Sequence, residues 1–325
     1  MQGRATASLA ALVTVALWAS AFVGIRSAGG RFSPGALTLG RLVVGAAVLG
    51  VVSAARRERL PPRAELRAVW PGLVLCGLLW FGAYNVALNA GERRVDAGTA
   101  AMLVNVGPIL VAALAGVVLA EGFPRPLLLG SVVAFAGVVV IAVATASGRD
   151  TSPVGVALCL LAAGAYSGGV VAQKPVLRRL SALQTTLLCC VVGAVATLPF
   201  APQLAAELGA APARATGWLV YLGVFPTAVA FTTWAFALAR TDAGRLAAMT
   251  YLVPPLSVLL GWLILGESPP APAFLGGALC LVGVWISRRR RRVPARLRES
   301  GGSSLYGMKS YGGAESMRLK NDPPT

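Results

Sequence analysis

Histidine is absent from the 325 residues, and charged residues make up only 13% of them, about half the share typical of a soluble domain. The lack of histidine excludes catalytic triads, general bases and metal sites that depend on imidazole. The five cysteines form no CxxC pair and all lie in apolar runs, so we interpret them as small buried hydrophobic residues. No Walker motif is present, which argues against direct use of ATP.

Hydrophobic residues make up 56% of the chain. A soluble protein cannot bury so many, because its surface must stay polar. The composition therefore excludes a disordered chain or an ordinary cytosolic enzyme, and favours an integral membrane protein. A helical span needs about 20 mostly apolar residues. Ten segments meet this need, at roughly 7–26, 34–54, 69–89, 97–120, 127–146, 154–173, 181–200, 217–238, 244–265 and 273–287. The expected fold is an all-α membrane protein with ten transmembrane helices.

The first segment has a second interpretation. It contains Ala19-Ser20-Ala21, a pattern found at signal-peptide cleavage sites. The apolar run continues to Ile25, however, and cleavage would leave nine spans. We therefore expect this segment to be kept as a span.

The net charge of +17 is concentrated in the loops and at the C-terminal end. With the N-terminus inside, the inner loops carry twelve Lys and Arg, the outer loops carry six, and the tail adds ten inside. The positive-inside rule then predicts a protein of the bacterial inner membrane with both termini cytoplasmic. Residues 288–325 are expected to form a basic, flexible tail, in which Arg288–Arg292 bind anionic lipid. We expect no nucleic-acid partner, and either a monomer or a homodimer.

The chain repeats itself at an offset of 146 residues. From 94 to 138 there are 16 identities in 45 positions without a gap. Arg94, Asp96, Ala97 and Gly98 fall on Arg240, Asp242, Ala243 and Gly244, and Glu121 falls on Glu267. The matched prolines are Pro108 with Pro254, Pro124 with Pro270 and Pro126 with Pro272. This predicts one five-helix repeat over 1–147 and a second over 153–287. An odd number of spans makes the two repeats inverted, an architecture of secondary transporters that work by alternating access.

Short motifs in this order resemble the EamA-like family of the drug/metabolite transporter superfamily. The matching residues are Trp18–Phe22, Pro34 with Arg41, Tyr84–Leu88, Pro108 with Glu121, Gly130 and Gly137, Gly223–Thr227, Trp234, and Pro254 with Glu267, Gly276 and Gly283. The resemblance covers about 7–287. It implies a ten-span exporter of amino acids or other metabolites, with substrate held in a central cavity between the halves.

Arg41 is the only charge well inside a span. An arginine within the membrane is costly, so it is expected to serve function, here by binding a substrate carboxylate or a carbonyl of a partner helix. The alternative is that its long side chain reaches the outer headgroups. Asn105 and Tyr251 precede Pro108 and Pro254 by three residues each. Because proline frees a backbone carbonyl, we favour a binding site there over a helix-to-helix hydrogen bond.

Tyr84, Asn85 and Asn89 form another polar group, which should face the interior because amides facing lipid are costly. They could contact either substrate or a neighbouring helix. The weaker candidates are Trp18, Ser20, Tyr166, Ser167, Thr227 and Trp234; for the aromatic ones the alternative is an interfacial anchor. The predicted substrate-binding set is Trp18, Ser20, Arg41, Tyr84, Asn85, Asn105, Tyr166, Trp234 and Tyr251.

Glu121 and Glu267 close equivalent spans at opposite faces of the membrane. The helix dipole opposes a negative charge at a helix C-terminus, which indicates a specific partner for each. We interpret both as gate residues and Pro108 and Pro254 as hinges; the alternative is a solvated helix end. The glycines at 130, 137, 276 and 283 are expected to serve close helix packing.

These features predict a secondary transporter that exports amino acids or other small metabolites, without a cofactor or metal. An uptake carrier or a channel is the alternative. A membrane-embedded lipid-modifying enzyme is disfavoured, because such chemistry needs paired carboxylates, a metal cluster or an activated nucleophile. No carboxylate lies deep in any expected span, so a buried proton relay is not visible.

Overall fold

The computed structural model describes residues 2–28, 30–59, 61–95, 97–145, 152–266 and 269–289, all within the unit Met1–Arg289. These residues form helices and loops, with no strand among them. Nine of the described helices are long and apolar enough to cross a membrane, and a bent pair makes ten. The expected all-α membrane fold is thus confirmed.

The first half has two simple spans, α1 (Gln2–Ala28) and α2 (Pro34–Ala55), followed by two interrupted ones. The third joins α3 (Arg63–Cys76), the π-helix η1 (Gly77–Ala83) and α4 (Tyr84–Gly91). The fourth joins α5 (Ala97–Val104) and α6 (Gly107–Val118). The fifth is α7 (Arg125–Thr145).

The second half begins with α8 (Pro153–Val176) and α9 (Ala182–Ala196). Its third span joins α11 (Ala213–Leu222), the π-helix η3 (Gly223–Val229) and α12 (Ala230–Leu238). The fourth joins α13 (Ala243–Ala247), the 3₁₀-helix η4 (Ala248–Leu252) and α14 (Val253–Leu265), and the fifth is α15 (Ala271–Arg288).

The seventh span differs from the straight segment expected over 181–200. Helix α9 ends at Ala196, a 3₁₀ turn η2 (Leu198–Phe200) follows, and α10 (Ala201–Ala210) continues after a bend of 56°. Pro199 and Pro202 lie at this bend. They lack the N–H that a continuous α-helix needs, which accounts for the change of direction. Helix α10 packs against α2, and the Ser33 backbone N–H donates to Glu207 Oε2 at 2.8 Å.

The structure repeats at the same offset as the sequence. The two π-helices, η1 and η3, each have seven residues and lie 146 positions apart. Pro108 and Pro254 occupy the first turns of α6 and α14, so both proline-containing spans are interrupted just before them. π-Helical turns in the middle of α-helices are uncommon and often mark functional sites.

Helices α7 and α15 pack along one another through the repeated glycines. A Cβ atom on Gly137 would lie 2.5 Å from the Gly276 carbonyl oxygen, and one on Gly276 would lie 2.7 Å from the Gly137 carbonyl oxygen. Only glycine allows backbones to approach this closely. The packing role expected for these glycines is confirmed.

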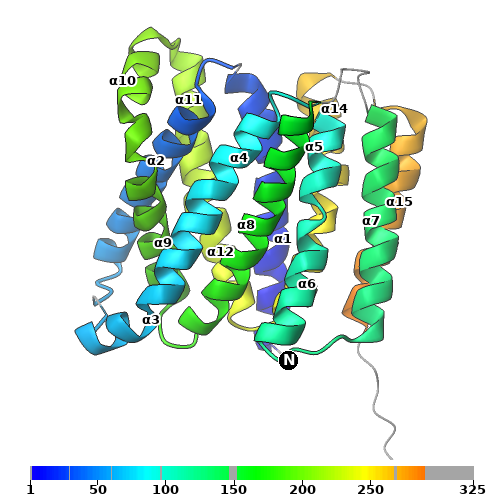
Figure 1. Cartoon of the computed structure of the whole chain (residues 1–325), viewed down its shortest axis with the longest axis horizontal. Coiled ribbons are helices and arrows are strands. Elements are labelled where there is room, and N and C mark those ends of the chain that lie inside the picture. The colour runs from blue at the N-terminus through cyan, green and yellow to red at the C-terminus, as the bar shows by residue number, and fades with distance from the viewer. Residues whose placement is uncertain are drawn as a thin grey trace, which may run out of the picture. The chain divides into compact units, whose positions relative to one another are not determined.

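The remaining spans of each half pack against the other half. Helix α1 contacts α12 and α14, α2 contacts α9, and α8 lies against both α4 and α6 (Figure 1). The N-terminus is at the end of the unit where α3 begins and α6 ends (Figure 1). All five cysteines are buried and free, as expected for small hydrophobic side chains.

Candidate substrate-binding cavity

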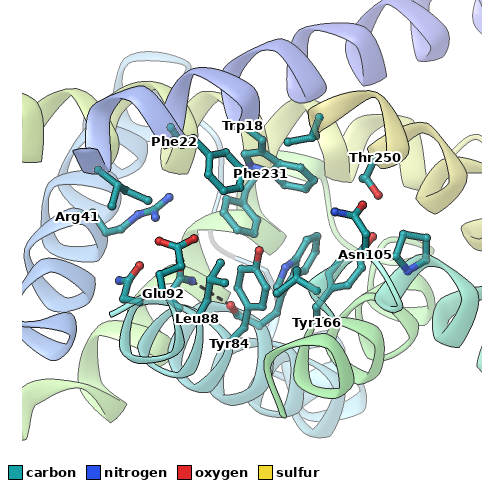
Figure 2. Close-up of a pocket in the computed structure, with 18 residues that line it drawn as sticks. Trp18, Phe22, Arg41, Tyr84, Leu88, Glu92, Asn105, Tyr166, Phe231 and Thr250 are labelled. Carbon is teal, nitrogen blue, oxygen red and sulfur yellow. Dashed lines mark hydrogen bonds between the residues drawn. The ribbon is translucent and has the colours of Figure 1, made fainter. Parts of the chain in front are cut away.

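A cavity of about 100 Å³ lies between the halves, well above the roughly 10–15 Å³ that one water needs. The first half contributes residues of α1, α2, η1, α4, α5 and α6, and the second half contributes α8, η4, α12 and α14. The polar side chains around it are Arg41, Tyr84, Asn85, Asn89, Glu92, Asn105, Tyr166 and Thr250. Figure 2 shows Arg41 and Glu92 at one end of the cavity, Asn105 and Thr250 at the other, and aromatic rings between them.

Arg41 lies at one end, and its side chain is held inside the protein. The residue is 6% exposed, and Nε donates to Thr227 Oγ1 at 3.0 Å. The Thr227 hydroxyl in turn donates to the Leu222 carbonyl oxygen, five residues earlier, at 2.8 Å. The π-helix η3 thus leaves a carbonyl that orients Thr227, and Thr227 orients the guanidinium. These contacts contradict the alternative in which Arg41 reaches the outer headgroups.

Glu92 faces Arg41 across the cavity (Figure 2), and the opposite charges attract one another. This carboxylate follows directly after α4 as its C-terminal cap residue. The span predicted from the sequence ends at 89, so Glu92 is not among the predicted site residues. Helical spacing is the signal that indicates it: Asn89 and Glu92 lie four and seven residues after Asn85 and share its face.

Asn85 and Asn89 are buried and face the interior, as expected. Asn85 Nδ2 donates to the carbonyl oxygens of Trp80 at 3.1 Å and Phe81 at 2.9 Å, both within η1. Asn89 Nδ2 donates to Thr38 Oγ1 of α2 at 3.1 Å. Both residues line the cavity and also bind protein groups, so each combines the two roles that the sequence left open.

Aromatic rings from both halves form the middle of the cavity. Trp80 lies 4.8 Å from Phe231, 5.5 Å from Tyr166 and 5.9 Å from Trp18, between ring centroids. Trp18 Nε1 also donates to the Pro226 carbonyl oxygen at 3.3 Å. Trp18 and Tyr166 therefore belong to an aromatic cluster within the protein, and the alternative of interfacial anchoring does not hold for them.

Asn105 and Thr250 lie close together at the end of the cavity opposite Arg41 (Figure 2). Asn105 follows α5 where the fourth span is interrupted, and its Nδ2 donates to the Ala101 carbonyl oxygen at 2.8 Å. Thr250 lies in η4, the equivalent interruption of the second half, and donates to the Ala247 carbonyl oxygen at 2.7 Å. Pro108 also lines the cavity.

Three predicted binding residues do not line the cavity. Ser20 shares a hydrogen bond of 2.7 Å with the Tyr221 hydroxyl, which links α1 to α11. Trp234 packs behind Trp18 at 5.2 Å between ring centroids, and Tyr251 is likewise fully buried. Trp234 Nε1 and Tyr251 Oη have no hydrogen-bond partner among the described residues.

Glu121 joins the two halves at the end of the unit away from Glu92. Its Oε1 accepts from the Ala243 N–H at 2.8 Å and its Oε2 from the Gly244 N–H at 3.2 Å. Lys174 Nζ lies 3.9 Å from Oε1 and donates to the carbonyl oxygens of Leu238 and Thr241. We name this set the Glu121 clasp. A carboxylate at the free N–H groups of a helix start is favourable, so the solvated-end alternative is wrong for Glu121. Glu267 lies outside the described residues.

A central cavity between repeated, interrupted helices of two inverted halves defines the chain as a secondary transporter by architecture. The EamA-like transporter family matches residues 5–143 and again 153–289, and the chain belongs to this family. It is therefore a multi-pass membrane transporter of the drug/metabolite type that acts on a small molecule, and not an enzyme.

Individual relatives agree with this assignment. The chain is 38% identical to a probable terminal-alkyne amino-acid exporter of Streptantibioticus cattleyicolor, over 86% of this chain and 93% of the relative. An uncharacterized transporter of Bacillus subtilis is 33% identical over 83% and 87%. A probable amino-acid metabolite efflux pump of Salmonella typhimurium is 25% identical over 68% and 77%. A solved crystal structure with 22% identity superposes with a TM-score of 0.71 over 88% of this chain and 97% of that one, which shows the fold.

Proposed function

We propose that this transporter exports amino acids or related small metabolites by alternating access across the bacterial inner membrane. The main observation is the cavity between the halves, which combines charged, amide and aromatic groups. Two relatives named as an amino-acid exporter and an amino-acid metabolite efflux pump support the substrate class and the direction. The predicted site follows from the same cavity: Trp18, Arg41, Tyr84, Asn85, Asn105 and Tyr166 line it. Ser20, Trp234 and Tyr251 do not line it, and we propose that they contact substrate in another conformation of the transport cycle.

The position of the Glu121 clasp supports alternating access. The Glu121 clasp lies at the end predicted to be cytoplasmic, and it ties α6 of the first half to α8 and α13 of the second. Ile25 and Glu92, which line the cavity, lie at the C-terminal ends of α1 and α4, away from the clasp. The clasp is then the inner gate, which must open for substrate to enter from the cytoplasm. Pro108 and Pro254, at the interruptions, are the proposed hinges, and Glu267 is the proposed outer gate residue.

The remaining proposals concern surroundings and assembly. Arg288–Arg292 bind anionic lipid at the inner face; within the described part, Arg289 stacks over the Trp285 ring at 3.5 Å, and Arg288 donates to Ser8 Oγ at 2.6 Å. Residues 290–292 lie outside the described residues. The two five-helix repeats are proposed to span 1–147 and 153–287, ahead of a cytoplasmic tail. No nucleic-acid partner is proposed, and the functional unit is a monomer or a homodimer.

Cells that overproduce the protein test the export proposal. They are loaded with dipeptides, and the amino acids inside and outside are compared with those of vector cells. Enrichment outside, against the gradient, is expected and separates a carrier from a channel. Depletion outside would turn the direction to uptake, and an unchanged medium with the protein in the membrane would contradict export.

Asn105→Leu is the matched site variant for this experiment. The substitution keeps the size of the side chain but removes its amide from the cavity end, so transport should fall to the vector level while expression stays normal. Val132→Leu, at an exposed position of α7, is the control and should transport normally. Normal transport by Asn105→Leu would remove this residue from the proposed site.

A further inference from the structure

Arg41 and Glu92 place two opposite charges at one end of a largely apolar cavity. Arg41 comes from α2 and Glu92 from the end of α4, and their charged groups face one another (Figure 2). Both line the same cavity, and Arg41 is nearly completely buried. Charges in such surroundings are costly unless they are compensated. Each therefore supplies part of the compensation for the other.

The guanidinium is fixed in a geometry suited to a carboxylate. Its Nε is occupied by Thr227 Oγ1, which sets the plane of the group at the cavity wall. The two Nη atoms of a guanidinium form a fork that matches the two oxygens of a carboxylate. Glu92 offers the opposite chemistry, because a carboxylate accepts hydrogen bonds from an ammonium group.

A ligand with a single charge fits this end of the cavity poorly. An anion would compensate Arg41 but repel Glu92, and a cation would do the reverse. A zwitterion brings a carboxylate to Arg41 and an ammonium to Glu92, so both protein charges keep a partner. The aromatic rings of Trp18 and Phe231 lie beside the charged pair and offer an apolar surface for a side chain (Figure 2).

We infer that Arg41 and Glu92 bind the carboxylate and the ammonium of a zwitterionic amino acid whose apolar side chain lies along Trp18 and Phe231. This inference rests on the proposed function and deepens it, because it assigns the charge state of the substrate and a residue to each charge. Asn105 and Thr250 then contact the far end of the substrate side chain.

Equilibrium binding to the purified full chain in detergent tests the assignment. The probes are L-phenylalanine and L-leucine as zwitterions, 2-phenylethylamine as the cation and 3-phenylpropanoate as the anion. The wild-type protein should bind at least one zwitterion tenfold or more tightly than either singly charged analogue. Equal binding of all the probes, or no binding of either zwitterion, would overturn the inference.

Two variants divide the recognition between the two residues. Arg41→Gln should weaken zwitterion binding tenfold or more and bring it level with the cation, whereas Glu92→Gln should bring it level with the anion. Arg41→Lys keeps the charge without the fork and serves if Arg41→Gln fails to fold; it should weaken binding less. Arg67→Gln and Glu65→Gln, at exposed positions of α3, are the matched controls and should retain wild-type selectivity. Wild-type selectivity in Arg41→Gln and Glu92→Gln would contradict the assignment.

Failure of the inference and failure of the proposed function give different results. Export from cells of a metabolite that is singly charged or has no ionised group, without selective zwitterion binding, would leave the export proposal standing and remove the assignment. Selective zwitterion binding without export would support the assignment of Arg41 and Glu92 and contradict the export proposal.

Discussion

The side chain of Glu121 contacts two backbone N–H groups that begin a span of the other half. Asp242 precedes α13 but makes no side-chain capping bond to it. Its Oδ2 lies 3.4 Å from Arg245 Nε instead. A glutamate from the first half therefore takes the place of the local cap. Such a bond contributes about 1 kcal/mol, and here it acts only while the two halves are together.

Glu121→Ala should loosen the start of α13. The amides of Ala243 and Gly244 lose their acceptor, so their hydrogen exchange should speed up roughly tenfold, which corresponds to about 1.4 kcal/mol. Hydrogen–deuterium exchange of the purified protein measures this. Glu121→Gln keeps one acceptor oxygen and should fall between Glu121→Ala and the wild type. Unchanged protection at these two amides in Glu121→Ala would show that the clasp does not hold the halves.

Ala120, the residue before Glu121, has a left-handed backbone conformation with φ of 55°. The equivalent residue of the second half is Gly266, with φ of 73°. An L-residue is strained there by roughly 1–2 kcal/mol. Ala120→Gly should therefore raise the thermal unfolding temperature by a few degrees. Ala113→Gly, at an exposed position inside α6, should lower it, because glycine weakens a helix interior. A fall in stability for both variants would contradict the strain at Ala120.

At the scale of elements, the two π-helices turn the polar faces of their spans toward the cavity. Each π-helical segment inserts an extra residue, which rotates the following helix by about 100° relative to a continuous α-helix. In η1 the freed carbonyls accept from Asn85, and in η3 the Leu222 carbonyl accepts from Thr227. These bonds fix the rotation that directs Tyr84 and Glu92 to the cavity and Thr227 to Arg41.

The α7–α15 pair gives a prediction about packing. Gly137→Val adds a side chain where a Cβ atom already lies 2.5 Å from the Gly276 carbonyl oxygen. The helices must move apart, which typically costs about 1–3 kcal/mol, and the unfolding temperature in detergent should fall. Gly164→Val, on α8, meets no atom within 4 Å of its Cβ and is the control. Equal losses in the two variants would show that the close approach is unimportant.

At the scale of the whole molecule, orientation decides which end of the cavity opens to the cytoplasm. All five native cysteines are buried, so a membrane-impermeant maleimide should label introduced exposed cysteines selectively. Arg214→Cys should react in intact cells, because this exposed position at the start of α11 is predicted to be outside. Arg59→Cys should react only after the membrane is permeabilised. The reverse pattern would invert the topology and place the Glu121 clasp outside.

The membrane class, the spans and the repeat could be predicted from the order of residues. These follow from local hydropathy, from the missing N–H of proline and from identities at one offset, none of which needs knowledge of packing. The sequence also placed Asn85 and Asn89 inside and found six of the residues that line the cavity. Polar groups in apolar helices were a sufficient signal, because lipid offers them no partner.

The contacts between polar side chains of different helices depend on the tertiary structure. Glu92 faces Arg41 because a π-helix rotates its span toward the cavity, and a strict period of 3.6 residues does not reveal that rotation. Glu121 accepts hydrogen bonds from Ala243 and Gly244, more than a hundred residues away, because the two halves pack together. Trp234 and Tyr251 have the residue types expected of a site, yet they lie behind its wall. The chain specifies each helix locally, but the surface that faces the substrate depends on how the two halves pack.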